Sequence, residues 1–252
     1  MEIQSSEPKI APWQMRKASS AISMIWRKPL PLQFLRVPNA PEPSNTESHP
    51  LSTRSYLNSP QKRVLDATGA LTLLFLLAPL LLLVALIIKS TSQGPVIFRQ
   101  KRCGAGGKPF EIWKFRSMYM TADTDHVVQA TRGDPRVTPV GRFIRRTSID
   151  ELPQLVNVLR GHMSLIGPRP HALSHDIYFG GQIDRYSDRF AARPGLSGLA
   201  QVRGARGETP EVADMERRIA LDLIYIHHAS LGMDVRIIAE TVQEMLVSRT
   251  AY

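Results

Sequence analysis

The residues best suited to chemistry in this 252-residue chain are two adjacent carboxylates, Asp150 and Glu151. Arg145 precedes the pair, whereas Arg169 and Arg193 each lie in a loop rich in proline and glycine. Guanidinium groups on rigid turns suit bidentate binding of phosphate oxygens. One carboxylate can then act as a nucleophile while the other holds a divalent cation. This combination favours phosphoryl transfer, in which positioning and charge neutralisation supply most of the catalysis.

The same pair also has a simpler, structural interpretation. Ser148 and Glu151 have the spacing of a capping box, and acidic residues are favourable at a helix N-terminus. Taken alone, this interpretation is the stronger of the two. The arginines that accompany the pair change the balance toward a functional site.

Four further residues are weaker candidates. His171 and His175 have the spacing of metal ligands on one helical face, but the acidic residue of a zinc-protease motif is absent, so we expect surface histidines. Asp222 lies within an apolar run and is either a buried, paired carboxylate or part of a polar face. Cys103 follows basic residues that could lower its pKa, but nothing nearby resembles a base with its orienting partner, so we expect a structural thiol.

An apolar stretch between Lys62 and Lys89 organises the rest of the chain. Residues 70–88 form about 19 nearly unbroken apolar positions, or about 28 Å of helix, close to one hydrocarbon thickness. Pro79 in the middle predicts a kink or break at Ala78-Pro79. Basic residues flank both ends, so the positive-inside rule places both ends in the cytoplasm. These features favour a re-entrant hairpin over a straight span, which stays as the alternative.

The composition limits the class of partner. The formal charge of +10 indicates anionic partners such as phospholipid headgroups or nucleotides. Nucleic acid is a poorer fit, because the basic residues are dispersed and lie beside a membrane segment. A single cysteine excludes an internal disulfide framework. The N-terminus lacks a signal-peptide pattern, so we expect most of the chain to face the cytoplasm.

The chain divides into three predicted parts. Residues 1–58 form a Pro- and Ser-rich, mostly disordered tail, 59–92 a membrane segment, and 93–252 a catalytic domain. In the third part we predict strands at 95–98 and 110–113 around a glycine turn, an exposed helical stretch at 171–192, and two helices between 211 and 247. Further short elements are predicted as a helix from Met118 to His126, a helix ended by Gly161, and an extended piece from Ser164 to Ile166. The expected fold is α+β and mostly helical.

Several long motifs occur in a fixed order over residues 60–252. They are KRVLDATGA, GPVIFRQKRCG, KFRSM, DPRVTPVGRFIRRTSIDELPQLVNVLRG, SLIGPRP and RPGLSGLAQVRG. Together they resemble the bacterial sugar transferase family, the small monotopic phosphoglycosyl transferases of the bacterial inner membrane. The resemblance implies a re-entrant helix-break-helix, here at Ala78-Pro79, and a small cytosolic domain with a β-hairpin and interfacial amphipathic helices.

The resemblance also implies an activity. The family transfers a sugar 1-phosphate from a UDP-sugar to undecaprenyl phosphate and releases UMP, which is the first membrane step of exopolysaccharide synthesis. The small size of the chain is similar to members that use galactose or glucose, although members that use N-acetylated sugars share the motifs. Inner-membrane lipids, downstream glycosyltransferases and a second copy of the chain are the other partners implied. The competing hypothesis is a non-catalytic, membrane-anchored scaffold for polysaccharide enzymes.

Roles for individual residues follow from the same resemblance. Asp150 is implied to be the nucleophile that forms an aspartyl-phosphosugar intermediate, and Glu151 to help bind Mg²⁺. The family's basic positions match Arg145, Arg169 and Arg193, implied to contact substrate phosphates. Lys114 and Arg116 are implied to line or support the same site, and Asp222 to support it. Ala205, after Gly204, differs from the family's pattern, but this difference leaves the Asp-Glu pair and these arginines unchanged.

Overall fold

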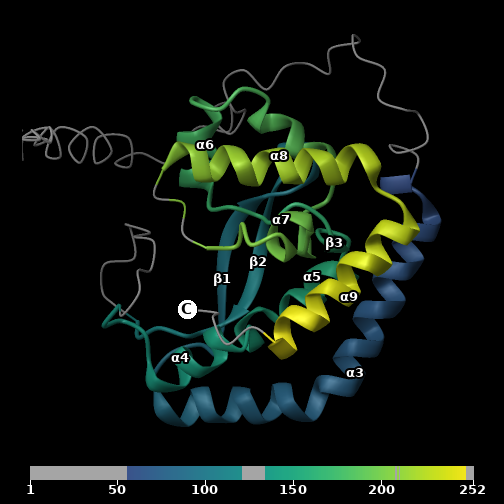
Figure 1. Cartoon of the computed structure of the whole chain (residues 1–252). Coiled ribbons are helices and arrows are strands. Elements are labelled where there is room, and N and C mark those ends of the chain that lie inside the picture. The colour runs from purple at the N-terminus through teal and green to yellow at the C-terminus, as the bar shows by residue number, and fades with distance from the viewer. Residues whose placement is uncertain (1–55, 121–133, 208, 210, 248–252) are drawn as a thin grey trace, which may run out of the picture.

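The computed structural model describes residues 56–120, 134–207, 209 and 211–247. Figure 1 shows their helices and strands, and its labels are kept below. Most of the predicted tail 1–58 and of the predicted helix 118–126 lies outside the described residues. Two residues before the predicted boundary at 59 take part in the fold, because Tyr56 donates a hydrogen bond to Asp234 (2.7 Å) and Leu57 is buried.

Helix α3 (Pro60–Thr91) is the long apolar element. The Ser59 hydroxyl caps it by accepting a hydrogen bond from the backbone N–H of Lys62 (3.1 Å), and the helix continues through Pro79. Its ribbon turns sharply part-way along, and the second leg runs below α4 (Figure 1). The predicted break is therefore a bend in a continuous helix. Proline removes one backbone donor and crowds the preceding turn, which bends a helix without having to end it.

The surface of α3 is unusual for a protein in water. Its buried residues lie near its two ends, and the side chains from Leu71 to Leu83 that flank the proline are exposed or half-buried. Leu71, Phe75 and Leu76 are among the large exposed hydrophobics. The helix is long and apolar enough to cross a membrane. A continuous apolar surface of this size indicates an apolar surrounding, which is consistent with a membrane anchor.

The predicted hairpin is confirmed. Strands β1 (Ile97–Cys103) and β2 (Pro109–Phe115) pair antiparallel around the short helix η2 (Ala105–Gly107). Gly106 and Gly107 both have positive φ, which explains the glycine cluster as a turn. Asn157 of helix α5 (Gln154–Leu159) joins this sheet, since its side chain accepts from Trp113 N (3.0 Å) and donates to Glu111 O (2.7 Å).

The remaining elements complete an α+β, mostly helical fold. They are α4 (Pro139–Arg146), η3 (Ile149–Glu151), β3 (Ser164–Ile166), α6 (Leu173–Gly180), η4 (Tyr186–Ala191), β4 (Gly195–Ser197), α7 (Leu199–Val202), α8 (Val212–His228) and α9 (Leu231–Val247). The extended piece at 164–166, the helix end at Gly161 and the two C-terminal helices were predicted and are confirmed. The stretch 171–192 is helical in part but not exposed throughout, because Phe179, Tyr186 and Arg189 are buried.

Apolar clusters join α3 to the rest of the molecule. Its first leg packs through Ala70 against residues of β2 and α5. Its second leg packs through Val84 and Ile88 against Phe115 of β2 and Ile144 of α4. Both legs are therefore held against elements that surround the Asp150-Glu151 pair.

A buried ionic cluster fixes the first turns of α3. The Lys62 ammonium lies 3.2 Å from Asp66 Oδ1 and 2.6 Å from Asp234 Oδ2, and all three side chains are at most 2% exposed. The hydroxyls of Tyr56 and Tyr225 also donate to Asp234, at 2.7 and 2.8 Å. Buried carboxylates of this kind are tolerated only while a cation and hydrogen-bond donors compensate them.

Replacing Lys62 by methionine is expected to destabilise the protein by about 3–5 kcal/mol, because the buried carboxylates of Asp66 and Asp234 both lose the ammonium that pairs with them. Thermal unfolding in detergent measures the effect. Lys89→Met is the control, since Lys89 is exposed near the other end of the same helix and should melt like the wild type. Equal melting temperatures for both variants would show that the cluster is not held by its charges.

Candidate active site

A sharp turn presents the acidic pair. Helix α4 ends at Arg146, and η3 begins at Ile149. Between them Ser148 has a φ of 59°, a left-handed conformation that costs a non-glycine residue about 1–2 kcal/mol. The predicted capping box is wrong: the Ser148 side chain makes no cap hydrogen bond and instead accepts one from Arg206 Nη2 at 2.6 Å.

Glu151 is the centre of a cation cluster. It is buried, and its Oε1 lies 2.9 Å from Lys114 Nζ of β2. Both terminal nitrogens of Arg169 also donate to it, Nη1 to Oε2 at 3.1 Å and Nη2 to Oε1. Burial alone would raise the pKa of Glu151, but the charges of Arg169 and Lys114 outweigh it and hold the pKa well below its usual range. Glu151 is therefore a fixed carboxylate with two cationic partners.

Asp150 is the more available carboxylate. It is half-buried and makes no hydrogen bond within the described part of the chain. Burial and the adjacent Glu151 raise the pKa of Asp150 to about 6, although Lys114, Arg145 and Arg169 act in the opposite direction. Asp150 is then mostly ionised at neutral pH. An ionised carboxylate without a bound donor can attack an electrophile.

Two proline-containing loops lie side by side next to the pair. The loop of Arg169 follows β3, the loop of Arg193 precedes β4, and these two strands pair in parallel. The backbone of Gly195 donates to Pro168 O at 2.9 Å, and a Cβ at Gly195 would lie 2.1 Å from the nitrogen of Gly167. Only glycine permits this close approach. The structure thus brings together the loops of Arg169 and Arg193, which are distant in sequence.

Arg116 does not join the cation cluster around Glu151. It is buried, and its guanidinium donates to Ser92 O, to Ser92 Oγ and to Pro95 O at 2.6–2.8 Å. These acceptors lie at the C-terminal end of α3 and in the connection to β1. Arg116 was predicted to line or support the site, and its hydrogen bonds instead secure the C-terminal end of α3.

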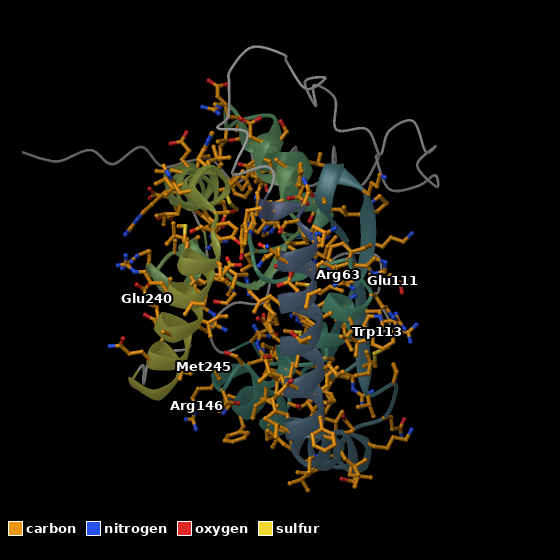
Figure 2. The ribbon with its side chains drawn as sticks, turned by 90° about the vertical axis from the view of Figure 1, so that its right-hand side faces the viewer. Arg63, Glu111, Trp113, Arg146, Glu240 and Met245 are labelled. Carbon is orange, nitrogen blue, oxygen red and sulfur yellow. The ribbon has the colours of Figure 1, made fainter. Side chains whose placement is uncertain are left out.

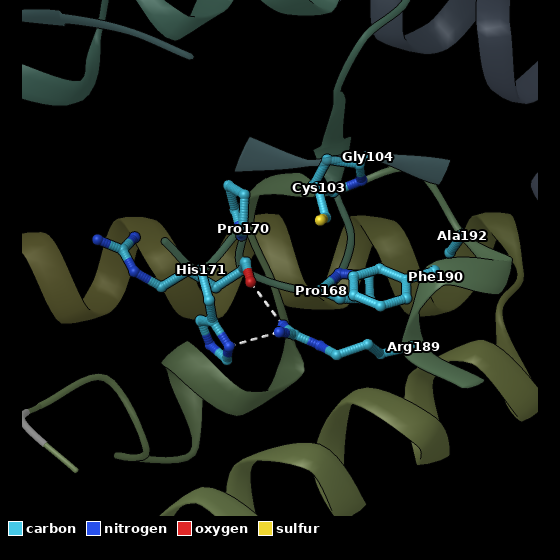
Figure 3. A pocket seen from close by; sticks show the side chains of 10 residues that line it. Cys103, Gly104, Pro168, Pro170, His171, Arg189, Phe190 and Ala192 are labelled. Atoms are coloured by element: carbon cyan, nitrogen blue, oxygen red, sulfur yellow. Dashed lines mark hydrogen bonds between the residues drawn. The ribbon is translucent and has the colours of Figure 1, made fainter. Parts of the chain in front are cut away.

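A buried network lies behind Arg169. Arg189 of η4 donates through Nη2 to the backbone carbonyl of Arg169 and to Asp222 Oδ2 at 2.9 Å, and through Nη1 to His171 Nδ1. Figure 3 shows Arg189 with two of these bonds, beside Pro168 and Pro170. Asp222 is 1% exposed, which answers the question left open by the sequence: it is a buried, paired carboxylate. Arg189 and Asp222 thereby hold the loop that carries Arg169.

The prediction of a surface His171 is wrong. Its side chain is 4% exposed, and burial together with the charge of Arg189 holds its pKa well below the usual value of 6.5. Because the Arg189 guanidinium donates to Nδ1, the neutral imidazole carries its proton on Nε2. Tyr186 also contacts Nδ1 (2.8 Å) and donates to Asp176 (2.7 Å). The metal-like spacing of His171 and His175 thus includes a buried histidine that takes part in a structural network.

The low pKa of His171 predicts a pH-dependent stability. Between the lowered folded value and the unfolded value near 6.5, the unfolded chain binds more protons, so stability falls as pH drops below about 6.5. His171→Asn keeps an acceptor for Arg189 and removes the titration. We expect the loss of melting temperature between pH 7 and pH 5 to be smaller in this variant than in the wild type. Parallel losses in both proteins would contradict a neutral, buried His171.

Two residues of the site were missed by sequence reasoning. Arg206 binds Ser148, and its charge also lowers the pKa of Glu151. Arg206 directly follows Ala205, where the sequence differs from the family's pattern. That difference was the one feature of the sequence that could have drawn attention to Arg206. Arg189 lies in the stretch that was expected to be exposed. Cys103 has the predicted structural role: it is free and buried, and burial raises the pKa of its thiol to about 12.

Comparison with known proteins decides the family. The model of the bacterial sugar transferase family matches residues 57–248. The chain belongs to the bacterial sugar transferase family. A Caulobacter vibrioides protein named UDP-glucose:undecaprenyl-phosphate glucose-1-phosphate transferase is 56% identical over 192 residues, which are 76% of this chain and 72% of that protein.

Two other relatives show how the shared part varies in context. A Klebsiella pneumoniae protein of the same name is 48% identical over 196 residues, which are 78% of this chain but 42% of that protein. The exopolysaccharide production protein PSS of Rhizobium leguminosarum bv. phaseoli is 48% identical over 185 residues, 72% of this chain and 92% of that protein. The chain therefore spans most of two of these bacterial sugar transferase relatives and under half of the Klebsiella one.

Proposed function

We propose that this chain transfers a hexose 1-phosphate from a UDP-sugar to undecaprenyl phosphate and releases UMP, as the first membrane step of exopolysaccharide synthesis. The names of the Caulobacter and Klebsiella relatives support these substrates, with glucose as the first sugar to test and galactose as the second. One observation carries the proposal: Asp150 is an ionisable carboxylate to which no group of the described residues donates a hydrogen bond, and it lies directly beside Glu151, which pairs with two cations.

The reaction we propose has two displacement steps. First, a carboxylate oxygen of Asp150 attacks the phosphorus that carries the sugar. The bond from this phosphorus to the UMP oxygen breaks, UMP leaves, and an aspartyl-phosphosugar remains. Second, a phosphate oxygen of undecaprenyl phosphate attacks the same phosphorus and displaces Asp150, which regains its carboxylate. The lipid product carries a diphosphate bonded to the sugar.

Cationic side chains neutralise charge in both steps. Lys114 and Arg169 already contact Glu151, and the charges of Arg145 and Arg206 reach the pair as well. Phosphoryl transfer concentrates negative charge on the transferred group and on the leaving oxygen, and fixed guanidinium groups stabilise both. Arg193, on the loop beside that of Arg169, is the further phosphate contact we propose.

The acidic pair fits Mg²⁺ as a cofactor. Mg²⁺ in proteins is commonly held by one or two carboxylates together with substrate phosphates and water, rather than by a complete protein cage. Glu151 has three of its four lone-pair positions in use by Lys114 and Arg169, which leaves one for a metal. Glu151 would hold the ion, and the ion would neutralise diphosphate charge. Loss of activity on chelation, with recovery on adding Mg²⁺, is the expected behaviour.

The membrane arrangement we propose is re-entrant. The bend in α3, its exposed apolar surface and the basic residues at both of its ends support a helix that enters and leaves on the cytoplasmic side of the inner membrane (Figure 1). Helix α9 adds an exposed apolar stripe at helical spacing, which suits a helix lying on the membrane surface. The stripe consists of Leu231, Val235, Ile238, Val242 and Met245.

The test uses purified protein in detergent with radiolabelled UDP-glucose, UDP-galactose and UDP-N-acetylated sugars. With undecaprenyl phosphate and Mg²⁺, we expect label to enter the lipid phase and UMP to appear in equal amount, fastest with a hexose. Absence of both products with every sugar would overturn the proposed function. For topology, cysteines introduced near 60 and 92 should be labelled from the same membrane face, and labelling from opposite faces would overturn the re-entrant arrangement.

A further inference from the structure

A cavity of about 700 Å³ lies between the bend of α3 and the turn that presents the acidic pair. It falls in the range of volumes that small-molecule sites occupy. Figure 2 shows two of its lining residues, Arg146 and Met245, close to each other. The complete lining is Leu77, Leu80, Arg146, Thr147, Ser148, Ile149, Leu152 and Met245. Four segments thus contribute: the middle of α3, the end of α4, the η3 turn and the end of α9.

The walls of this cavity are mostly apolar. Leu77 and Leu80 lie two residues before and one residue after Pro79, on the part of α3 whose neighbouring leucines are exposed. Met245 is the last residue of the exposed apolar stripe on α9 and is 61% exposed. An apolar ligand can therefore pass from the surroundings of α3 into the cavity without crossing a polar surface.

The polar part of the lining leads to the nucleophile. Thr147, Ser148 and Ile149 line the cavity, and Asp150 is the next residue. Arg146, in the last turn of α4, adds an exposed guanidinium that the proposed chemistry does not use. The cations that bind Glu151, Lys114 and Arg169, are not among the lining residues. The cavity thus combines one positive charge with a long apolar wall, and its polar lining ends one residue before Asp150.

We infer that this cavity binds the acceptor of the proposed reaction, with the first isoprene units against Leu77, Leu80 and Met245 and the lipid phosphate beside Arg146. The inference rests on the proposed function and assigns the acceptor a place separate from that of the UDP-sugar. A prenyl phosphate matches the lining at both ends, since a branched hydrocarbon chain fits the apolar wall and a phosphate pairs with a guanidinium.

Two substitutions test the cavity, each with a matched control. Leu77→Trp fills it, whereas Leu76→Trp adds the same bulk on the neighbouring residue, which is 65% exposed and does not line the cavity. Arg146→Gln removes the charge, whereas Arg142→Gln removes an exposed charge one turn earlier in α4. We expect the first member of each pair to raise KM for undecaprenyl phosphate at least about tenfold, with KM for the UDP-sugar unchanged.

The first half-reaction separates this inference from the proposed function. Without lipid acceptor, the wild type and both cavity variants should release a burst of UMP equal to the amount of enzyme, because sugar-phosphate transfer to Asp150 needs no acceptor. No burst in the wild type would overturn the proposed function. A normal burst with unchanged lipid KM in Leu77→Trp and Arg146→Gln would overturn the cavity assignment alone. If Leu77→Trp loses its burst, Met245→Trp at the exposed end of α9 replaces it in the test. A normal burst with a raised KM for undecaprenyl phosphate would support the cavity assignment, and a normal burst with an unchanged KM would overturn it.

Discussion

Asp150→Asn is expected to reduce turnover at least about 10⁴-fold, as loss of a covalent nucleophile does in other enzymes. An amide of the same shape cannot attack phosphorus. The fold should be unaffected, because the Asp150 carboxylate makes no hydrogen bond within the described residues and none is lost. Removing its charge also relieves the repulsion with Glu151 that raises the pKa of Asp150. The melting temperature should therefore stay the same or rise.

Two measurements check this prediction. Intact-mass analysis after incubation with UDP-glucose alone should show a hexose phosphate on the wild type and none on Asp150→Asn. UMP release in the full reaction gives the rate. Asp184→Asn is the control, since Asp184 is an exposed carboxylate outside the cation cluster and should behave as the wild type in both assays. A covalent adduct on Asp150→Asn, or turnover above about one per cent of wild type, would assign the nucleophile elsewhere.

Local patterns in the sequence predicted the local elements well. The glycine turn at 106–107 with strands on both sides is a short-range signal, and β1 and β2 form the predicted hairpin, although β1 runs from Ile97 to Cys103 and not over 95–98. The apolar run from 70 to 88 likewise predicted one long helix, because length and hydropathy suffice for that conclusion. The bend in place of a break was harder to predict, since proline permits both outcomes and packing of the second leg against Phe115 and Ile144 decides between them.

Long-range contacts account for what the sequence did not show. His171 was expected at the surface because the sequence shows only its spacing to His175. Its burial depends on contacts with Arg189 and Tyr186, which belong to η4. The role of Ser148 was also missed, because a capping box and a left-handed turn share the same residue types. Its actual partner, Arg206, is 58 residues away. Motif reasoning singled out the Asp150-Glu151 pair but not the residues that hold its surroundings in place.

Arg189→Lys is expected to lower kcat about 10²-fold while the protein stays folded. Lysine keeps the positive charge opposite Asp222, which avoids the large cost of an unpaired buried carboxylate. It cannot reproduce the planar fork, so it cannot bind Asp222, His171 and the Arg169 carbonyl at the same time. The Arg169 loop then loses its buried anchor, and a displacement of about 1 Å at a catalytic group costs about 10²-fold.

Steady-state kinetics with UDP-glucose and thermal unfolding measure the two parts of this prediction. Arg185→Lys is the matched control: Arg185 is 52% exposed, and its ion pair with Asp188 is 2.8 Å long. Exposed pairs contribute little, so this variant should retain wild-type kinetics. If Arg189→Lys keeps wild-type kcat, the buried network serves the fold alone and has no part in positioning Arg169.

A double-mutant cycle shows whether Arg189 acts through Arg169. Within the described residues, Arg189 forms no hydrogen bond with Glu151 or Asp150, and its bond toward the site ends on the Arg169 carbonyl. If positioning is its role, Arg189→Lys should cost about 10²-fold in the wild type and little in an Arg169→Lys background, where the bidentate contact with Glu151 is already lost. Equal losses in both backgrounds would mean that Arg189 affects the reaction by another route, such as the packing of α8 through Asp222. The cycle thus separates a positioning residue from one that only stabilises the domain.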